Sequence, residues 1–324
     1  MIKCWITEKR WFVVLDHLQS LFAYIWRPVV SLKHFSELIL LAALWGASFL
    51  FMRVATPEFG AVLLIELRVL IAALVLLPFW LVSEPASVRR TTLEHWQGLT
   101  IVGLLNSAIP FVLFAYSTLY ITGGFASILN ATAPIWGGLV AWIWLRRVLQ
   151  GGEILGLVIG FLGVILLVSG SLEWSMQGKT LGVLAAFSAP ILYGVAANYT
   201  SEKLSHLSPL TIATFSQFSS AIVLLPFTIW FLPTQAISLH AWLSVIALAV
   251  FCTSLAYLLY FRLIAAIGST RAITVTFLIP VFGMLWGSVF LEEQVSVSML
   301  IGTSVILAGT ALVNGFIKIG VARK

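Results

Sequence analysis

The sequence predicts an all-α integral membrane protein whose ten transmembrane helices form two inverted five-helix repeats. Three observations predict this fold. The 324-residue chain is 60% hydrophobic and only 9% charged, with a mean hydropathy of +1.06. Apolar runs of roughly 17 to 25 residues, long enough to cross a hydrocarbon core, recur along it. The second half also repeats the first. These features exclude a water-soluble globular protein, and the continuous apolar runs disfavour a transmembrane barrel, whose strands alternate in polarity.

The first 35 residues precede the regular membrane pattern. Their apolar stretches, 11–15 and 21–26, are short and are interrupted by Asp16, His17 and Arg27, so a spanning helix is disfavoured. We expect a cytoplasmic or interfacial extension over 1–35. An amphipathic interfacial helix and a dispensable leader are both open, whereas the long apolar core and cleavage site of a signal peptide are absent.

Ten apolar runs follow, separated by short polar connections, and each is interpreted as one membrane span. They cover residues 37–54, 61–82, 97–116, 125–145, 154–168, 181–197, 211–231, 242–265, 272–291 and 298–316. We expect the first five, within 36–170, to form one repeat and the last five, within 171–324, to form the other.

Basic residues gather in the N-terminal segment and in every second connection between spans. Those of the connections are Arg89, Arg90, Arg146, Arg147, Lys203 and Arg271, whereas the opposite connections hold one clear base, Lys179, beside Glu58, Glu173, Glu292 and Glu293. The positive-inside rule therefore places both termini in the cytoplasm of a bacterial cell with the chain in its inner membrane. The net charge of +6 is explained by these loops and predicts no nucleic-acid partner.

An internal repeat determines the predicted architecture. An offset of 146 positions lays one half on the other, pairing Ala126 with Ala272, Pro134 with Pro280, Gly137 with Gly283, Gly156 with Gly302 and Gly163 with Gly309. Each half holds an odd number of spans, so the two copies must be inverted relative to each other. The same offset lays the basic pair Arg146–Arg147 on the acidic pair Glu292–Glu293, as an inversion across the membrane predicts.

These residues resemble the drug/metabolite transporter superfamily, in particular its EamA-type family. The resemblance extends from Glu37 onward and is carried by Trp45-Gly46-Ala47-Ser48-Phe49, Arg68, the Pro134 and Pro280 segments with Gly137 and Gly283, Leu291-Glu292-Glu293, and the glycine-rich fifth and tenth spans. Arg146–Arg147 departs from the pattern, since the family often carries an acidic residue there. The resemblance implies a ten-helix carrier that exports or exchanges amino acids and related metabolites.

Two ionisable residues of the second span are candidate site residues. Charged groups deep in a membrane are energetically costly, so they are usually paired with another group or have a function. Arg68 is a candidate contact for a substrate carboxylate, with a structural ion pair as the alternative. Glu66 is the leading titrating group if transport is coupled to protons; its structural alternative is an ion pair with Arg53, which could instead pair with Glu58. A separation of two positions along the chain corresponds to a rotation of about 200° around a helix, so Glu66 and Arg68 do not share a face.

Uncharged polar and aromatic residues within the spans could complete a substrate site at the interface of the repeats. They are Trp45, Asn106, Asn130, Tyr193, Asn198, Gln217 and Tyr257. Each could instead form a hydrogen bond between helices. Pro134 and Pro280 are candidate hinges; the alternative is that they only shape the packing of their helices. Spaced glycines such as Gly152, Gly156 and Gly160 favour helix packing, with a homodimer through the fifth or tenth span as a further alternative.

The expected function is secondary transport of a small metabolite by alternating access, with membrane lipid as the surrounding partner and without cofactor, metal or nucleotide. Gly178-Lys179-Thr180 resembles the end of a phosphate loop, but Glu173 stands where that loop needs glycine. Two cysteines, Cys4 and Cys252, offer no thiolate cluster. A membrane-embedded enzyme of lipid or isoprenoid metabolism is the alternative, although clustered acids or histidines at a membrane face are lacking.

Overall fold

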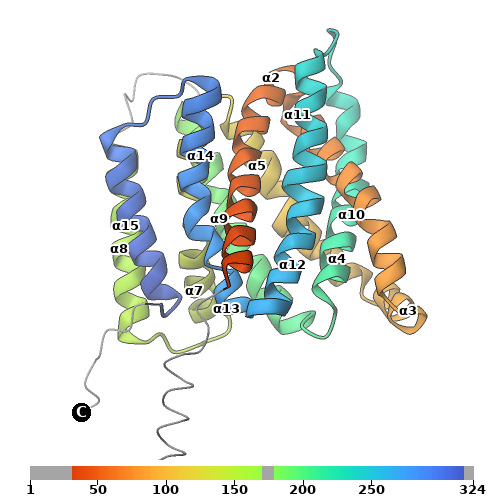
Figure 1. Cartoon of the computed structure of the whole chain (residues 1–324), viewed down its shortest axis with the longest axis horizontal. Coiled ribbons are helices and arrows are strands. Elements are labelled where there is room, and N and C mark those ends of the chain that lie inside the picture. Colours follow the sequence, from red (N-terminus) through yellow and green to blue (C-terminus); the bar gives the residue numbers. More distant parts are fainter. Residues whose placement is uncertain (1–30, 170–178, 317–324) are drawn as a thin grey trace, which may run out of the picture.

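The computed structural model describes residues 31–169 and 179–316, and every regular element within these ranges is helical (Figure 1). In chain order the elements are α2 (Leu32–Ser83), α3 (Ala86–Glu94), α4 (Trp96–Gly103), η1 (Leu104–Ala108), α5 (Ile109–Ser117), α6 (Gly123–Asn130), α7 (Ala133–Trp144), α8 (Gly151–Ser169), α9 (Lys179–Lys203), α10 (Pro209–Thr228), η2 (Ile229–Phe231), α11 (Leu239–Ala249), η3 (Val250–Leu255), α12 (Ala256–Ile267), α13 (Ser269–Ala272), α14 (Val275–Leu291) and α15 (Val297–Val313). The predictions for 1–30, for Cys4, and for Glu173 and Gly178 lie outside the described residues.

Seven helices in the described part of the chain are long and apolar enough to cross a membrane. They are Leu32–Ser83, Trp96–Ser117, Gly123–Trp144, Gly151–Ser169, Lys179–Lys203, Pro209–Phe231 and Leu239–Ile267. The first contains both of the first two predicted spans, and the shorter apolar helices α14 and α15 correspond to the last two. The protein is therefore an all-α membrane protein.

The long helix α2 is two helical segments that meet at Gly60. This residue has φ 71° and ψ 159°, a conformation outside the helical region that glycine adopts without steric cost. The chain reverses its direction there. The evidence is that Arg68 Nη1 lies 3.9 Å from Met52 Sδ, although the two residues are 16 positions apart. A straight helix would separate them by about 24 Å. The two segments place α2 at the centre of the molecule, packed against α10, α11 and α14.

The backbone itself recurs with the offset of 146 positions. Arg146 and Glu292 follow α7 and α14, and they are the two non-glycine residues with positive φ in the described ranges, at 52° and 56°. This left-handed conformation is sterically costly for residues with a Cβ atom. The same turn is therefore built at equivalent positions of the two halves.

Two π-helical segments follow the same offset. η1 begins at Leu104 and η3 begins at Val250, 146 positions later. A π-helical turn inside an α-helix is rare and is frequent at functional sites. Each turn widens a helix in the interior of the molecule, between α4 and α5 in one half and between α11 and α12 in the other.

Helices α8 and α15 lie side by side and pack backbone to backbone (Figure 1). A Cβ atom on Gly156 would lie 2.7 Å from the carbonyl oxygen of Gly309, and one on Gly302 would lie 3.3 Å from that of Gly163. The early part of one helix thus meets the late part of the other, so the two run antiparallel. Their glycines pack within the chain by the close approach that small residues permit; the homodimer stays a prediction.

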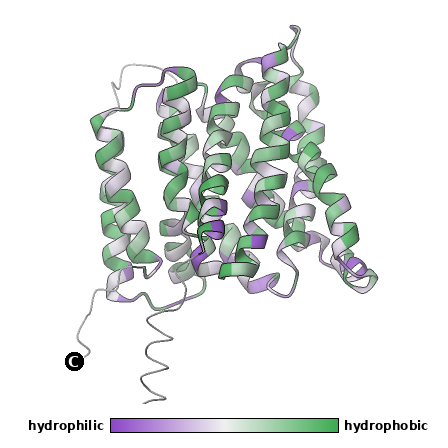
Figure 2. Ribbon diagram, in the orientation of Figure 1, coloured by the Kyte–Doolittle hydropathy of each residue, from purple (hydrophilic) through white to green (hydrophobic). Residues whose placement is uncertain are grey.

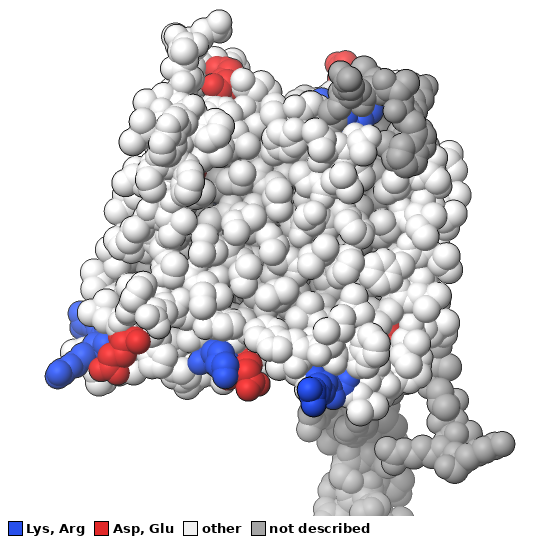
Figure 3. Space-filling model, turned by 180° about the vertical axis from the view of Figure 1, so that it is seen from behind, with Lys and Arg blue, Asp and Glu red and all other residues white. Residues whose placement is uncertain are grey.

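Polar and apolar residues occupy different levels along the helix axes. The helical walls are mostly apolar, and hydrophilic residues concentrate at the helix ends (Figure 2). On the face shown in Figure 3, Lys and Arg side chains gather with Asp and Glu at one end, and the flank between the two ends is almost free of charged groups. That basic end is the end of the α3 and α13 segments (Figure 1). An uncharged band of this kind fits the hydrocarbon region of a bilayer.

Candidate functional site

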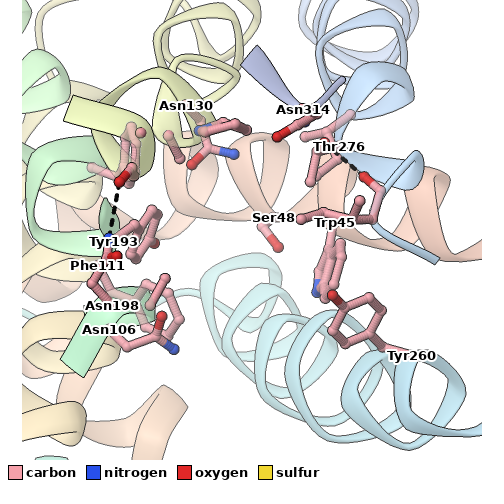
Figure 4. Close-up of a pocket in the computed structure, with 18 of the residues that line it drawn as sticks. Trp45, Ser48, Asn106, Phe111, Asn130, Tyr193, Asn198, Tyr260, Thr276 and Asn314 are labelled. Atoms are coloured by element: carbon pink, nitrogen blue, oxygen red, sulfur yellow. Dashed lines mark hydrogen bonds between the residues drawn. The ribbon is translucent and has the colours of Figure 1, made fainter. Parts of the chain in front are cut away.

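A cavity of about 580 Å³ lies among the central helices, within the usual range for small-molecule sites. Side chains from both halves line it. Its polar and aromatic lining includes Trp45, Ser48, Asn106, Asn130, Tyr193, Asn198, Tyr257, Tyr260, Thr276 and Asn314. In Figure 4, Asn106, Tyr193 and Asn198 gather on one side of the cavity, with Trp45 and Tyr260 on the opposite side.

Most of the residues singled out in the sequence meet at this cavity. Arg68, Trp45, Asn106, Asn130, Tyr193, Asn198 and Tyr257 line it, as does Pro134 in the first turn of α7. Glu66, Gln217 and Pro280 do not line it. Pro280 lies inside α14, so the two repeat-related prolines occupy different places in their helices. Their roles as hinges stay predictions.

Arg68 is a buried cation in the cavity wall. Its side chain is held by neutral groups: Nε donates to Thr253 Oγ1 at 3.0 Å, Nη1 lies 3.9 Å from Met52 Sδ, and Cζ lies 3.6 Å from the centre of the Phe111 ring. The residue is only 4% exposed, and among the described residues no carboxylate forms an ion pair with it. A buried charge without a counter-ion is costly, so the chemistry of this guanidinium would favour an anion in the cavity.

The two π-helical segments bring repeat-related residues to the same cavity. Asn106 in η1 and Cys252 in η3 are 146 positions apart and both line it. One turn further on, Phe111 and Tyr257 repeat this relation. The cavity therefore lies between equivalent parts of the two halves. Thr253 in η3 also supplies the hydroxyl that orients Arg68.

Glu66 and Gln217 are buried and do not belong to the cavity lining. Gln217 Nε2 donates to Ser107 Oγ at 2.8 Å. Glu66 is 3% exposed, and its Oε2 has no hydrogen-bond partner among the described residues. The structural pairing suggested for Glu66 was wrong, because Arg53 instead pairs with Glu293 and Glu58 accepts hydrogen bonds from Ser238.

Contacts between α2, α6 and α14 join these helices at the end of the molecule opposite α13 (Figure 1). Glu293, just after α14, accepts from the backbone N–H groups of Gly123 and Gly124 at 2.9 and 3.3 Å. These are the first residues of α6, whose N-terminal N–H groups lack helical partners and favour an anion. Arg53 Nε lies 3.8 Å from the same carboxylate, and Arg53 Nη1 donates to the carbonyl oxygen of Thr118. We call these contacts the Glu293 latch.

The cavity opens beside the connection between α7 and α8. Arg147, Leu149 and Glu153 line this mouth. Arg147 Nη2 lies 2.7 Å from Glu153 Oε1, and the arginine side chain is 60% exposed. The mouth therefore lies at the basic end of the molecule, opposite the Glu293 latch.

Several lining residues were missed in the sequence. Ser48, Thr276 and Asn314 line the cavity, but small polar side chains are common in membrane helices and carry little signal. Tyr260 could have been found, because it lies three positions after Tyr257 and shares a helix face with it. Its ring lies 5.2 Å from that of Trp45.

The chain belongs to the EamA-like transporter family. The family model matches residues 37–169 and again residues 180–315, so the family domain occurs twice. A solved structure described only as a crystal structure of a protein superposes with a TM-score of 0.59 and 19% identity, covering 86% of this chain and 96% of that one. That likeness shows the fold alone.

Curated relatives extend over most of the chain. "Uncharacterized transporter YvbV" of Bacillus subtilis (strain 168) is 24% identical over 282 residues, covering 86% of this chain and 90% of the relative. "Probable amino-acid metabolite efflux pump" of Salmonella typhimurium (strain LT2) is 28% identical over 290 residues, covering 84% and 91%. "Probable terminal-alkyne amino-acid exporter" of Streptantibioticus cattleyicolor is 22% identical over 284 residues, covering 86% and 92%. Family and relatives indicate a small-molecule transporter rather than an enzyme.

Proposed function

We propose that this protein is a secondary transporter that exports or exchanges amino acids or related carboxylated metabolites by alternating access. Arg68 carries the proposal: it is a buried cation, in the wall of a central cavity, with no carboxylate partner among the described residues. A substrate carboxylate would supply the missing counter-charge through charge-assisted hydrogen bonds. Asn106, Asn130, Tyr193, Asn198, Tyr257 and Trp45 would line the rest of the site.

We propose further that ten segments cross the membrane as two inverted five-helix repeats. The reversal of α2 at Gly60 supports two crossings within that helix. The antiparallel contact between α8 and α15 supports inversion, because the fifth span of each half would then run in opposite directions. The domains would comprise residues 36–170 and 171–324, preceded by the 1–35 extension.

The proposed orientation places both termini in the cytoplasm, with the chain in a bacterial inner membrane. Support comes from the bases gathered at one end of the described helices (Figure 3), the end at which α3, with Arg89, and α13, with Arg271, lie (Figure 1). The cavity mouth lies at this end, beside Arg147. In this orientation the structure corresponds to a conformation open to the cytoplasm, and opening of the Glu293 latch would expose the cavity to the other side.

Reconstitution into liposomes tests the proposal. Vesicles preloaded with an unlabelled amino acid or hydroxy acid should take up the labelled compound by counterflow, at a rate well above that of protein-free vesicles. Conversion of the compound without flux would instead establish an enzyme and overturn the proposal.

Arg68→Ala should abolish this counterflow while the protein elutes as the same monodisperse species. Loss of folded protein in this variant would show that Arg68 is needed for structure rather than for substrate.

A further inference from the structure

The charges in the cavity wall differ from those that a zwitterion needs. Three of the described lining residues are charged: Arg68, Arg147 and Glu153. Arg147 and Glu153 neutralise each other at the mouth, with 2.7 Å between Nη2 and Oε1. Arg68 is left as a single net positive charge in the buried part of the cavity. One negative charge on the substrate would balance it.

The remaining polar groups of the lining are neutral. Four amides, Asn106, Asn130, Asn198 and Asn314, lie around the cavity with hydroxyl groups such as that of Ser48. Asn198 Nδ2 already donates to the carbonyl oxygens of Gly137 and Gly194 at 2.9 and 2.8 Å. Asn314 Nδ2 is buried without an acceptor among the described residues. Such groups can donate to a carboxylate or bind a neutral hydroxyl or carbonyl.

An α-ammonium group would be poorly matched here. In an α-amino acid the ammonium lies within a few ångströms of the carboxylate, so a carboxylate bound to Arg68 would bring it close to the guanidinium. Like charges repel more strongly at reduced dielectric than in water. The carboxylate that could offset this, Glu153, is at the mouth and is already paired.

We infer that the cavity selects monoanionic carboxylates that lack a free ammonium group, such as 2-hydroxy acids, 2-oxo acids or N-acyl amino acids, over the zwitterionic amino acids of the same side chain. The inference rests on the proposed transport function and refines its substrate class. The carboxylate would bind Arg68. An apolar or aromatic body would pack against Trp45, Tyr260 and their neighbours.

Matched substrate pairs test this inference in liposomes. Alanine with lactate, leucine with 2-hydroxy-4-methylpentanoate, and phenylalanine with 3-phenyllactate differ at the α-substituent alone. We expect the half-saturating concentration for counterflow to be lower by about tenfold or more for the hydroxy acid of the preferred pair. Protein-free vesicles correct for passive diffusion of the protonated acids.

The outcomes separate this inference from the broader function. Equal or tighter binding of the amino acids would overturn the inference and leave the transporter intact. Counterflow of none of the six compounds would overturn both.

Charge variants provide a second test. Arg68→Lys should keep the preference for the hydroxy acid. Counterflow by Arg68→Gln should fall, and equilibrium binding to this variant in detergent should give dissociation constants for the two compounds whose ratio is near one. Arg262→Gln is the matched control, because Arg262 pairs with Glu37 at 2.9 Å and does not line the cavity. It should leave the ratio unchanged.

Asn106→Asp keeps the inference testable if the Arg68 variants fail to fold. The new carboxylate would cancel the charge of Arg68 and should reverse the preference toward the amino acid. An unchanged preference in folded Asn106→Asp would overturn the inference.

Discussion

Replacing Glu293 with Gln should shift the protein toward the conformation that opens at the latch end. Glu293 caps α6 by accepting from the N–H groups of Gly123 and Gly124, and it lies 3.8 Å from Arg53 Nε. The amide of Gln can replace one acceptor, but its NH2 group faces the second N–H. The variant also loses the negative charge at the helix N-terminus.

The magnitude follows from these contacts. The lost hydrogen bond contributes about 1 kcal/mol and the charge at the helix N-terminus about 0.5 kcal/mol. Arg53 is partly exposed, so solvent screening limits its ion pair to about 0.5 kcal/mol. The total is about 2 kcal/mol, which corresponds to a shift of roughly 30-fold in the equilibrium between the two conformations.

Labelling of a buried residue at the latch provides the assay. Thr118 is 1% exposed and its carbonyl oxygen accepts from Arg53. Thr118→Cys, in a chain whose two native cysteines are replaced by Ser, would react with a membrane-impermeant maleimide when this end opens. The rate should rise by roughly 30-fold in Glu293→Gln.

The neighbouring Glu292 is the matched control. It carries the same charge but its side chain is exposed, so Glu292→Gln should leave the labelling rate near that of the parent. An unchanged rate in Glu293→Gln, or an equal rise in both variants, would show that Glu293 does not hold this end of the protein together.

Two further predictions concern buried positions outside the cavity. Gly156→Ala should destabilise the protein by about 1–3 kcal/mol, because the new methyl would lie 2.7 Å from the carbonyl oxygen of Gly309; Gly152→Ala on the same helix meets nothing within 4 Å and should not lower the unfolding temperature in detergent. If transport is proton-coupled through Glu66, Glu66→Gln should retain counterflow but lose uptake driven by a pH gradient. Uptake that still follows the gradient would assign Glu66 a structural role only.

The membrane segments could be predicted from the sequence because few charged residues interrupt them. The turn at Gly60 fell in the short gap between the first two predicted spans. The π-helical turns could not be predicted, since η1 and η3 carry no residue pattern that differs from an ordinary apolar helix. Their positions depend on tertiary packing between the halves, which local sequence does not encode.

The candidate site could be predicted in part. Arg68 and the amides stand out in the sequence because polar groups are rare in apolar spans. Helical spacing predicts that Glu66 and Arg68 lie on different faces of their helix, and of these two residues only Arg68 lines the cavity. Rarity alone could not separate lining residues from packing residues: Gln217 is as polar as Asn106, yet it hydrogen-bonds Ser107 in a helix contact. That distinction needs the rotation of each helix about its axis.

The charge swap between the halves makes the two ends of the molecule unequal. Glu293 caps α6 at the end of the molecule opposite the basic end, whereas the residue 146 positions earlier is Arg147. A guanidinium has no acceptor and cannot cap a helix N-terminus; Arg147 pairs with Glu153 instead. Under the proposed inversion, this chain therefore cannot form a symmetry-related latch at the basic end. The conformation closed at the Glu293 end gains contacts that the opposite conformation lacks, so we expect the cavity to rest open toward the basic end, where a cytoplasmic substrate would enter.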